Sequence, residues 1–283
     1  MGAFLFYLLK SGCCLVVFYI FFKLLMSRST FFHFNRITLL VGLLGCTLLP
    51  LIELTTTEET FLHTPLYAIH EILQSTESVI LNPEQMEDPI LISEKNPEIN
   101  SLNWIPVTLA FIYGVGALVT LIWLSLSTCR LIQLIRTSEK KQFGNYVLVI
   151  PQQPTASFSW GKYIVISAAD YSQQSEEILL HEMMHLRNHH TLDLLFMQIF
   201  LLVYWFNPVV WLLKRELQEV HEFEADNGVI NTGIDATKYQ LLLVKKAVGT
   251  RLYSMANGFN HSKLKKRITM MSVSYTHLRA HET

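Results

Sequence analysis

The pentapeptide His181-Glu182-Met183-Met184-His185 lies inside a stretch that the sequence predicts to be helical. An α-helix advances by about 100° per residue. His181 and His185 therefore project from one face, one turn apart, where two imidazoles can reach the same Zn²⁺ ion. Glu182 is then placed to take a proton from the water that the metal activates. The spacing predicts zinc-dependent peptide hydrolysis, with Zn²⁺ as the cofactor.

The surroundings of this pentapeptide favour a buried helix. Ser175 is a helix-capping residue type, and Glu176 and Glu177 place negative charge in the first turn, where the helix dipole favours it. The other faces carry apolar side chains: Ile178, Leu179, Met183, Met184 and Leu186. Buried histidines without partners are costly, and a bound metal removes that cost. The alternative is a core helix whose histidines are only hydrogen-bonded.

A third metal ligand has to come from elsewhere in the chain. His189 lies eight positions after His181, about 12 Å along the helix axis, which is too far to share an ion. The extended metzincin pattern is excluded because Asn188 and Thr191 stand where it requires glycine and histidine. The remaining candidates share one face of a downstream helix, and spacing alone does not choose among them: Glu219, Glu222 and Asp226.

The composition indicates an integral membrane protein. Hydrophobic residues make up 51% of the 283 residues, charged residues only 16%, and the mean hydropathy is +0.31. The apolar residues gather in blocks of near membrane-spanning length: Phe4–Leu25, Ile37–Ile52, Ile105–Ser127 and Leu194–Leu213. The first block lacks a basic start and a small-residue cleavage site, so we expect a permanent anchor rather than a signal peptide.

Short basic segments predict the orientation of these spans. Between the first two blocks lie Lys23, Arg28 and Arg36, and the third block is followed by Arg130, Arg136, Lys140 and Lys141. Positive residues favour the cytoplasmic side, so the N-terminus is expected outside. Residues 54–103 are rich in acidic residues and prolines and form an expected extracytoplasmic loop. This loop is either a solubilising connector or a segment that senses a ligand or contacts a partner.

The fourth block has to return to its starting side, since His185 precedes it and possible ligands follow it. Trp205-Phe206-Asn207-Pro208 lies at its middle, where proline interrupts a helix. We therefore expect two short arms, a membrane-embedded hairpin at about residues 194–213. The active site is then expected at the cytoplasmic membrane surface.

Two further segments predict surfaces near the site. Tyr146–Ile150 and Lys162–Ile166 are short β-rich runs that predict a small sheet. Within it, residues 157–162 are a candidate edge for binding an extended peptide, the alternative being a purely structural hairpin. The basic residues Lys263, Lys265, Lys266 and Arg267 predict contact with anionic membrane lipid. A net charge of −1 speaks against direct nucleic-acid binding.

The segment Glu222-Phe223-Glu224-Ala225-Asp226 resembles the E-x-x-A-D signature of membrane gluzincins. This resemblance implies that Glu222 is the third zinc ligand. It also implies that Asp226 steadies a ligating histidine, as carboxylates commonly do. The other acids of this region, Glu216, Glu219 and Glu224, are expected on a solvated helix face. The donor for the oxyanion stays open among Arg187, His189, His190 and His221.

Most of residues 1–271 resembles the bacterial beta-lactam sensor-transducer family of membrane zinc metallopeptidases. The resemblance rests on the zinc motif, on the E-x-x-A-D segment, and on three further stretches: Phe158–Lys162, Trp205–Pro208 and Ser262–Met271. It implies a protease of the bacterial cytoplasmic membrane that acts in signal transduction. On an extracytoplasmic signal it would cleave its own cytoplasmic loop or a cytosolic repressor. The oligomeric state stays open, with a dimer as one option.

The expected fold is mainly α-helical: a transmembrane bundle with a gluzincin-like zinc protease domain at its cytoplasmic face and a small β-sheet. Its parts are a transmembrane hairpin (1–53), the acidic loop (54–103), a third span (104–128) and the protease domain (129–271). Residues 272–283 resemble a translated adapter sequence and are expected to be a non-native tail.

Two other functions use the same residues. A housekeeping membrane protease for processing or quality control would need no sensor. A non-catalytic transducer would hold a structural zinc ion, but structural sites usually have four protein ligands, and Glu182 would then have no task.

Overall fold

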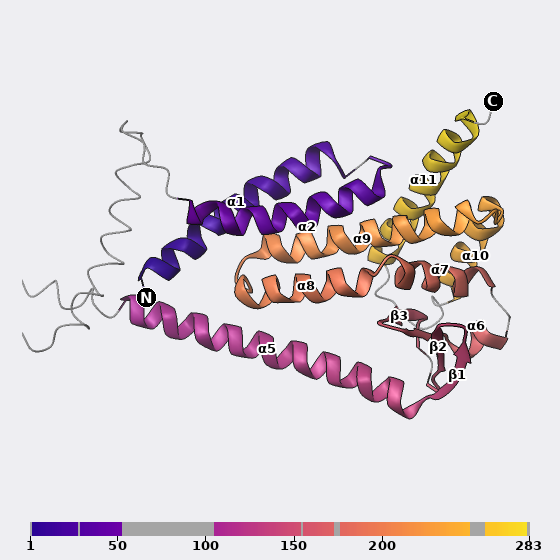
Figure 1. Ribbon diagram of the computed structural model, residues 1–283, viewed down its shortest axis with the longest axis horizontal. Coiled ribbons are helices and arrows are strands. Elements are labelled where there is room, and N and C mark those ends of the chain that lie inside the picture. The colour runs from indigo at the N-terminus through magenta and orange to yellow at the C-terminus, as the bar shows by residue number, and fades with distance from the viewer. Residues whose placement is uncertain are drawn as a thin grey trace, which may run out of the picture.

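The computed structural model describes residues 2–27, 29–52, 105–153, 155–172, 176–249 and 258–281 (Figure 1). The predicted acidic loop and the predicted helix cap Ser175 lie outside these residues. The described chain is mainly helical, with one small sheet, as predicted. Its helices are α1 (Gly2–Leu25), α2 (Phe32–Leu48), α5 (Ile105–Thr137), α6 (Ala168–Ser172), α7 (Glu176–Arg187), α8 (His190–Val203), α9 (Pro208–Asn231), α10 (Ala236–Gly249) and α11 (Gly258–His281), with a short 3-10 turn at Leu49–Leu51.

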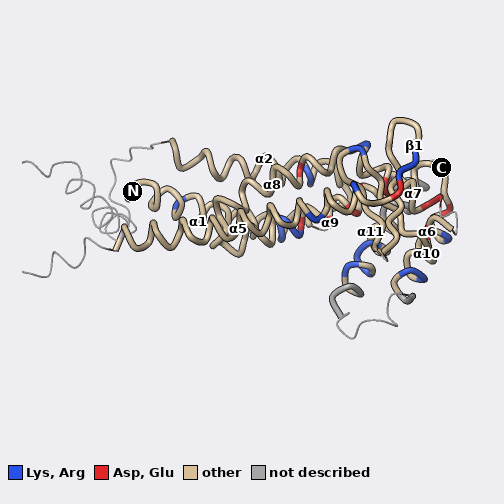
Figure 2. The backbone as a smooth tube through the Cα atoms, turned by 90° about the horizontal axis from the view of Figure 1, so that it is seen from below, with Lys and Arg blue, Asp and Glu red and all other residues tan. Residues whose placement is uncertain are grey.

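Three described helices are long and apolar enough to cross a membrane: Ala3–Leu25, Phe32–Leu51 and Val107–Thr137. Figure 2 shows charged residues gathered over α7, α10, α11 and the adjoining part of α9, whereas α1 and α5 carry few. The third predicted span, residues 104–128, corresponds to α5, which continues to Thr137 and is therefore longer than predicted. Its 33 residues extend roughly 50 Å, more than the hydrocarbon core of about 30 Å. One end of α5 is therefore expected to extend beyond the hydrocarbon core.

The fourth apolar block does form a hairpin, in which the chain turns between α8 and α9 (Figure 1). Asn207 caps α9 by accepting a hydrogen bond from the Val209 N–H at 3.0 Å, and Pro208 occupies the first helical turn. The prediction of two short arms is wrong for the second arm. Proline at this position starts a helix instead of breaking one. As a result α9 runs unbroken for 24 residues and carries Glu222 and Asp226 as well.

The hairpin packs against the first two helices. A buried apolar cluster joins α1, α2, α8 and α9, and includes Leu15, Phe22, Leu39, Leu43, Leu201, Leu213 and Leu217. On the other side, α5 approaches the hairpin turn at Gly116, where an added Cβ atom would lie 2.0 Å from the Trp205 ring. This glycine lets the two segments pack closely. The cluster and this contact fix the position of α9, which leads to the polar end of the molecule.

The sheet has the strand order β1-β2-β4-β3. Its strands are β1 (Glu139–Phe143), β2 (Tyr146–Ile150), β3 (Phe158–Trp160) and β4 (Tyr163–Val165). The two predicted strands are present as β2 and β4, but they pair in parallel, so they do not form a hairpin with each other. The chain between them supplies β3, which pairs antiparallel with β4 at the edge of the sheet. This edge strand contacts α7.

Candidate metal centre

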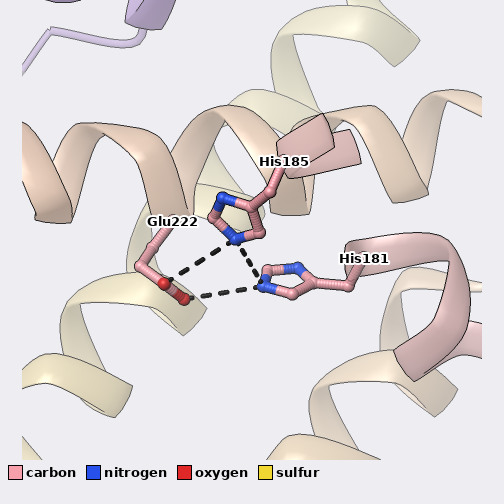
Figure 3. Close-up of side chains that lie close together, drawn as sticks. All are labelled: His181, His185 and Glu222. Atoms are coloured by element: carbon pink, nitrogen blue, oxygen red, sulfur yellow. Dashed lines mark hydrogen bonds and ion pairs between the residues drawn. The ribbon is translucent and has the colours of Figure 1, made fainter. Parts of the chain in front are cut away.

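Helices α7 and α9 bring His181, His185 and Glu222 together (Figure 3). The two Nε2 atoms of the histidines are 3.2 Å apart. The Glu222 carboxylate lies 3.6 Å from His181 Nε2 and 3.8 Å from His185 Nε2. These three residues meet because the histidines lie one turn apart on α7, and α7 packs directly against α9.

The donor atoms fit a zinc ion. Tetrahedral coordination with Zn–N bonds of about 2.0–2.1 Å places ligand atoms roughly 3.3–3.4 Å apart, close to the observed separations. Two imidazoles and a carboxylate also match the ligand types of catalytic zinc sites. In both histidines it is Nε2 that faces the other ligands, while Nδ1 contacts a protein group. Both Nε2 atoms therefore face the space where a metal ion would bind.

His181 is supported by groups from α9, α10 and α11. Its Nδ1 atom lies 3.2 Å from Asp226 Oδ1 and 3.0 Å from the Tyr239 hydroxyl, which donates to Asp226 Oδ1 at 2.8 Å. Arg267 clamps the same carboxylate, with Nε donating to Oδ2 at 2.8 Å and Nη2 to Oδ1 at 2.6 Å. Arg267 Nη1 lies 2.9 Å from Glu222 as well. We call these residues, Asp226, Tyr239 and Arg267, the carboxylate support.

Burial and neighbouring charges shift the pKa values of Asp226 and His181. Burial alone would raise the pKa of the fully buried Asp226, but Arg267 and His181 hold it below its ordinary value. Burial acts to lower the pKa of His181, yet Asp226 and Glu222 raise it to about 9. An ionised Asp226 is therefore the stable form, and it accepts the hydrogen bond from the His181 ring.

His185 is supported differently, by another histidine. Its Nδ1 atom lies 2.7 Å from His190 Nδ1, and His190 Nε2 lies 3.1 Å from Glu224 Oε2. The His190 ring is 2% exposed and stacks on His221, with the ring centroids 4.0 Å apart. Burial, with His181 as the next cause, lowers the pKa of His185 to about 3, so this ring stays neutral.

Glu182, which the sequence predicts to be the general base, is 6% exposed. Burial raises its pKa, while the charge of His181 and a side-chain hydrogen bond from Ser159 of β3 act in the opposite direction. Glu182 lines a cleft of about 490 Å³ that also contains His181, Glu222, Lys246 and other residues of α10 and α11. Glu182 therefore lies in the wall of this cleft.

A second cleft, of about 340 Å³, lies on the His185 side. It is lined by residues of α5, β3 and α8, among them Leu131, Trp160 and Leu194. Glu222 and Gln218 of α9 line both clefts. The three converging side chains thus lie where the two clefts meet, with the edge strand β3 alongside.

Three acids predicted to be solvated are instead paired. Glu216 contacts Lys23, Glu219 contacts Lys266 at 2.8 Å, and Glu224 contacts His190. Their side chains are only 12%, 16% and 13% exposed, respectively. The prediction was wrong because the partners of these acids come from elements that the spacing within α9 does not reveal.

In the predicted lipid-binding segment, only Arg267 differs from the expectation of an exposed basic residue. Lys263 and Lys265 are exposed, and Lys266 pairs with Glu219. Arg267 instead turns inward to the site, because its planar guanidinium can bind two carboxylates at once. Of the four oxyanion candidates, Arg187 and His189 are exposed, while His190 and His221 are buried in contacts of their own.

Four residues of the site were not assigned these roles from the sequence: Arg36, His190, Tyr239 and Arg267. A signal existed for His190, which follows the zinc motif within the same polar stretch, and for Arg267, which ends a lysine run. For Arg36, which donates a hydrogen bond to Asp193, the sequence contained no such signal, since the two residues are 157 positions apart. Tyr239 had no such signal either, although Asp226 is only 13 positions away.

A His-Glu-x-x-His helix whose histidines meet a glutamate from a second helix defines the class of the metallopeptidases. Comparison with known families agrees with this class. The chain belongs to the family described as BlaR1 peptidase M56, whose sequence model matches residues 12–271. The predicted resemblance to the beta-lactam sensor-transducer family is thereby confirmed.

Two curated relatives carry the same family name. The chain is 34% identical to "Regulatory protein BlaR1" of Staphylococcus aureus over 84 residues, which are 28% of this chain and 14% of that protein. It is 38% identical to "Regulatory protein BlaR1" of Bacillus licheniformis over 55 residues, which are 19% of this chain and 9% of that protein. The matched stretches thus cover a small part of each relative.

Proposed function

We propose that the protein is a membrane-embedded zinc metalloendopeptidase that acts in signal transduction. The observation that carries this proposal is the convergence of His181, His185 and Glu222 where two clefts meet, with Glu182 beside them. Three protein ligands leave room for a further ligand, as catalytic zinc sites require and structural sites usually do not.

The side chains of this chain have distinct tasks in peptide hydrolysis. A Zn²⁺ ion held by His181, His185 and Glu222 would supply Lewis-acid polarisation of the peptide carbonyl and lower the pKa of a water molecule. Glu182 accepts one proton of that water while the water oxygen bonds to the carbonyl carbon. When the carbon–nitrogen bond breaks, Glu182 delivers the proton to the leaving amine. Asp226 keeps the His181 ring in the orientation that binding needs.

The edge strand and the clefts support a peptide as the substrate. A peptide lying along β3 could form main-chain hydrogen bonds with it while occupying both clefts. We propose that this peptide belongs either to a cytoplasmic loop of the protein itself or to a cytosolic repressor, cleaved in response to an extracytoplasmic signal. The names of the two curated relatives, both regulatory proteins, support this direction.

We also propose a location in the bacterial cytoplasmic membrane, with the N-terminus outside and the site on the cytoplasmic side. The three apolar helices support the membrane location. The basic residues Lys23 and Arg36 at the ends of α1 and α2 support the orientation, since positive residues favour the cytoplasmic side.

The test replaces the proposed base. Purified Glu182→Gln protein in detergent should bind Zn²⁺ as the unaltered protein does but cleave about 10²–10⁴-fold more slowly. Cleavage would be followed on fluorescent casein and, for self-cleavage, by mass spectrometry of the chain. Glu176→Gln, at an exposed position of the same helix, is the matched control and should keep full activity. Cleavage that persists in Glu182→Gln rejects the mechanism.

A further inference from the structure

A chain of contacts leads from the metal ligand His185 to the helix α2, which lies outside the protease region. His185 contacts His190, His190 contacts Glu224, and Glu224 contacts Arg36 of α2 at 3.5 Å. A parallel branch runs from His221, stacked on His190, to Asp193 at 2.8 Å, and from Asp193 to Arg36 Nε at 2.6 Å. Both branches end on the same guanidinium.

The atoms of this chain fix which nitrogen of each ring carries a proton. If His185 binds a metal through Nε2, its Nδ1 carries the proton and donates it to His190 Nδ1. His190 Nδ1 must then be an acceptor, so the proton of this neutral ring is on Nε2. That N–H faces the Glu224 carboxylate at 3.1 Å. Each donor thus meets an acceptor from the metal ligand to the carboxylate.

The backbone places His190 for this contact. His189 adopts a left-handed conformation, with φ of 58°, at the turn between α7 and α8. This turn lets α8 begin at His190, whose buried ring lies against His185, with ring centroids 4.9 Å apart. His189 itself is exposed. Arg36 Nη2 also donates to the carbonyl oxygen of Asn188 at 2.6 Å, so α2 holds the turn from outside.

We propose that His190 and Glu224 are positioning residues of the metal site, which hold the His185 ring in the tautomer and orientation that bind zinc, and that Arg36 of α2 anchors them. This inference rests on the proposed zinc site. It extends the usual carboxylate–histidine–zinc arrangement by one imidazole. The metal site is then connected to the N-terminal helix pair by side chains alone.

The experiment measures zinc affinity rather than hydrolysis, by competition with a chelator on the purified full chain in detergent. His190→Phe keeps the stacked ring but removes both nitrogens, so Zn²⁺ should bind about 10–100-fold more weakly. His190→Gln should recover part of this loss, because its amide oxygen can accept from His185 and its amide nitrogen can donate to Glu224. Partial recovery distinguishes a hydrogen-bonding role from a packing role.

Two controls make the outcomes unambiguous. His189→Asn changes the neighbouring exposed histidine to a residue that tolerates the left-handed conformation, and it should leave zinc affinity unchanged. The absorption bands of bound Co²⁺ should shift in His190→Phe and stay unchanged in His189→Asn. If His190→Phe fails to fold, Glu224→Gln takes its place and should weaken zinc binding several-fold.

Zinc affinity within twofold of the unaltered protein in His190→Phe, or in Glu224→Gln where that variant is used, overturns the inference. So does a His190→Gln variant that binds as weakly as His190→Phe. Failure of the proposed function has a different appearance: the unaltered protein would then bind no zinc, or His185→Ala would bind it as tightly as the unaltered protein does.

Discussion

The two histidines of the candidate metal centre are held in different ways. His181 rests on the carboxylate support, in which Asp226 contacts the ring directly and Arg267 clamps the acid. His185 contacts a second imidazole, that of His190, and His190 in turn contacts the Glu224 carboxylate. The first arrangement comes from α9 and the helices that follow it, while the second reaches back to α2. The contacts of His181 therefore come from residues 226–267, whereas the contacts of His185 lead back to Arg36 of α2.

The largest effect is expected when Asp226, the acidic residue of the carboxylate support, loses its charge. Asp226→Asn leaves Arg267, whose side chain is 19% exposed, with Glu222 as its remaining acidic partner, so the protein should lose about 3 kcal/mol of stability. Zinc affinity should fall as well, about 10–100-fold. Thermal unfolding in detergent and chelator competition measure the two effects. Asp235→Asn, an exposed helix cap that asparagine also satisfies, is the control. Equal behaviour of the two variants contradicts this prediction.

A smaller effect is expected at the anchor of the other support. Arg36→Met removes the cation from Asp193 and Glu224, which should cost about 2 kcal/mol because hydrogen bonds to charged groups are lost. Zinc affinity should decrease less than in Asp226→Asn, since Arg36 acts through two intervening residues. The same two measurements apply, with Arg215→Met at an exposed position of α9 as the control. A larger loss of zinc affinity than in Asp226→Asn would reverse the comparison.

Tyr239→Phe tests one hydrogen bond of the carboxylate support. The hydroxyl donates to Asp226, which keeps Arg267 and His181 as partners without it. We expect a loss of about 1 kcal/mol in stability and only a few-fold weaker zinc binding. Tyr171→Phe, which removes an exposed hydroxyl, should change neither quantity. If Tyr239→Phe abolishes zinc binding, the hydroxyl and not Asp226 is the main support of His181.

The smallest effect is expected at the neighbour of Arg267. Lys266→Ala removes an ion pair whose lysine is 48% exposed, and such pairs contribute about 0–1 kcal/mol. Zinc affinity should stay unchanged, whereas Arg267→Ala should weaken it. Chelator competition on both variants gives the contrast between adjacent positions of α11. A loss of zinc affinity in Lys266→Ala would contradict this prediction, because it would mean that Lys266 supports the metal site as Arg267 does.

The sequence predicted those parts of the site that follow from helical periodicity. His181, Glu182 and His185 lie within five residues, so a single helix determines their relative positions. Glu222 and Asp226 came from a family resemblance, since spacing left three acids open. The structure places Glu222 beside the two histidines and Asp226 against His181, and the role of Glu222 as a zinc ligand stays a prediction.

The sequence could not predict contacts between distant segments. Arg36 and Glu224 are separated by most of the chain, and nothing in either segment reveals the other. The same limit applies to the sheet, where two strands were predicted but their parallel pairing was not. Local patterns determine which elements form, whereas the packing of those elements determines which charges meet.

The position of Arg267 in the chain has a consequence for biosynthesis. This arginine follows Asp226 by 41 residues, and it is the cation that lies against both Asp226 and Glu222. A nascent chain that has folded α7 and α9 but not yet α11 holds two neighbouring carboxylates without that counter-charge. The order of synthesis therefore leaves these two carboxylates without the Arg267 guanidinium until α11 has docked.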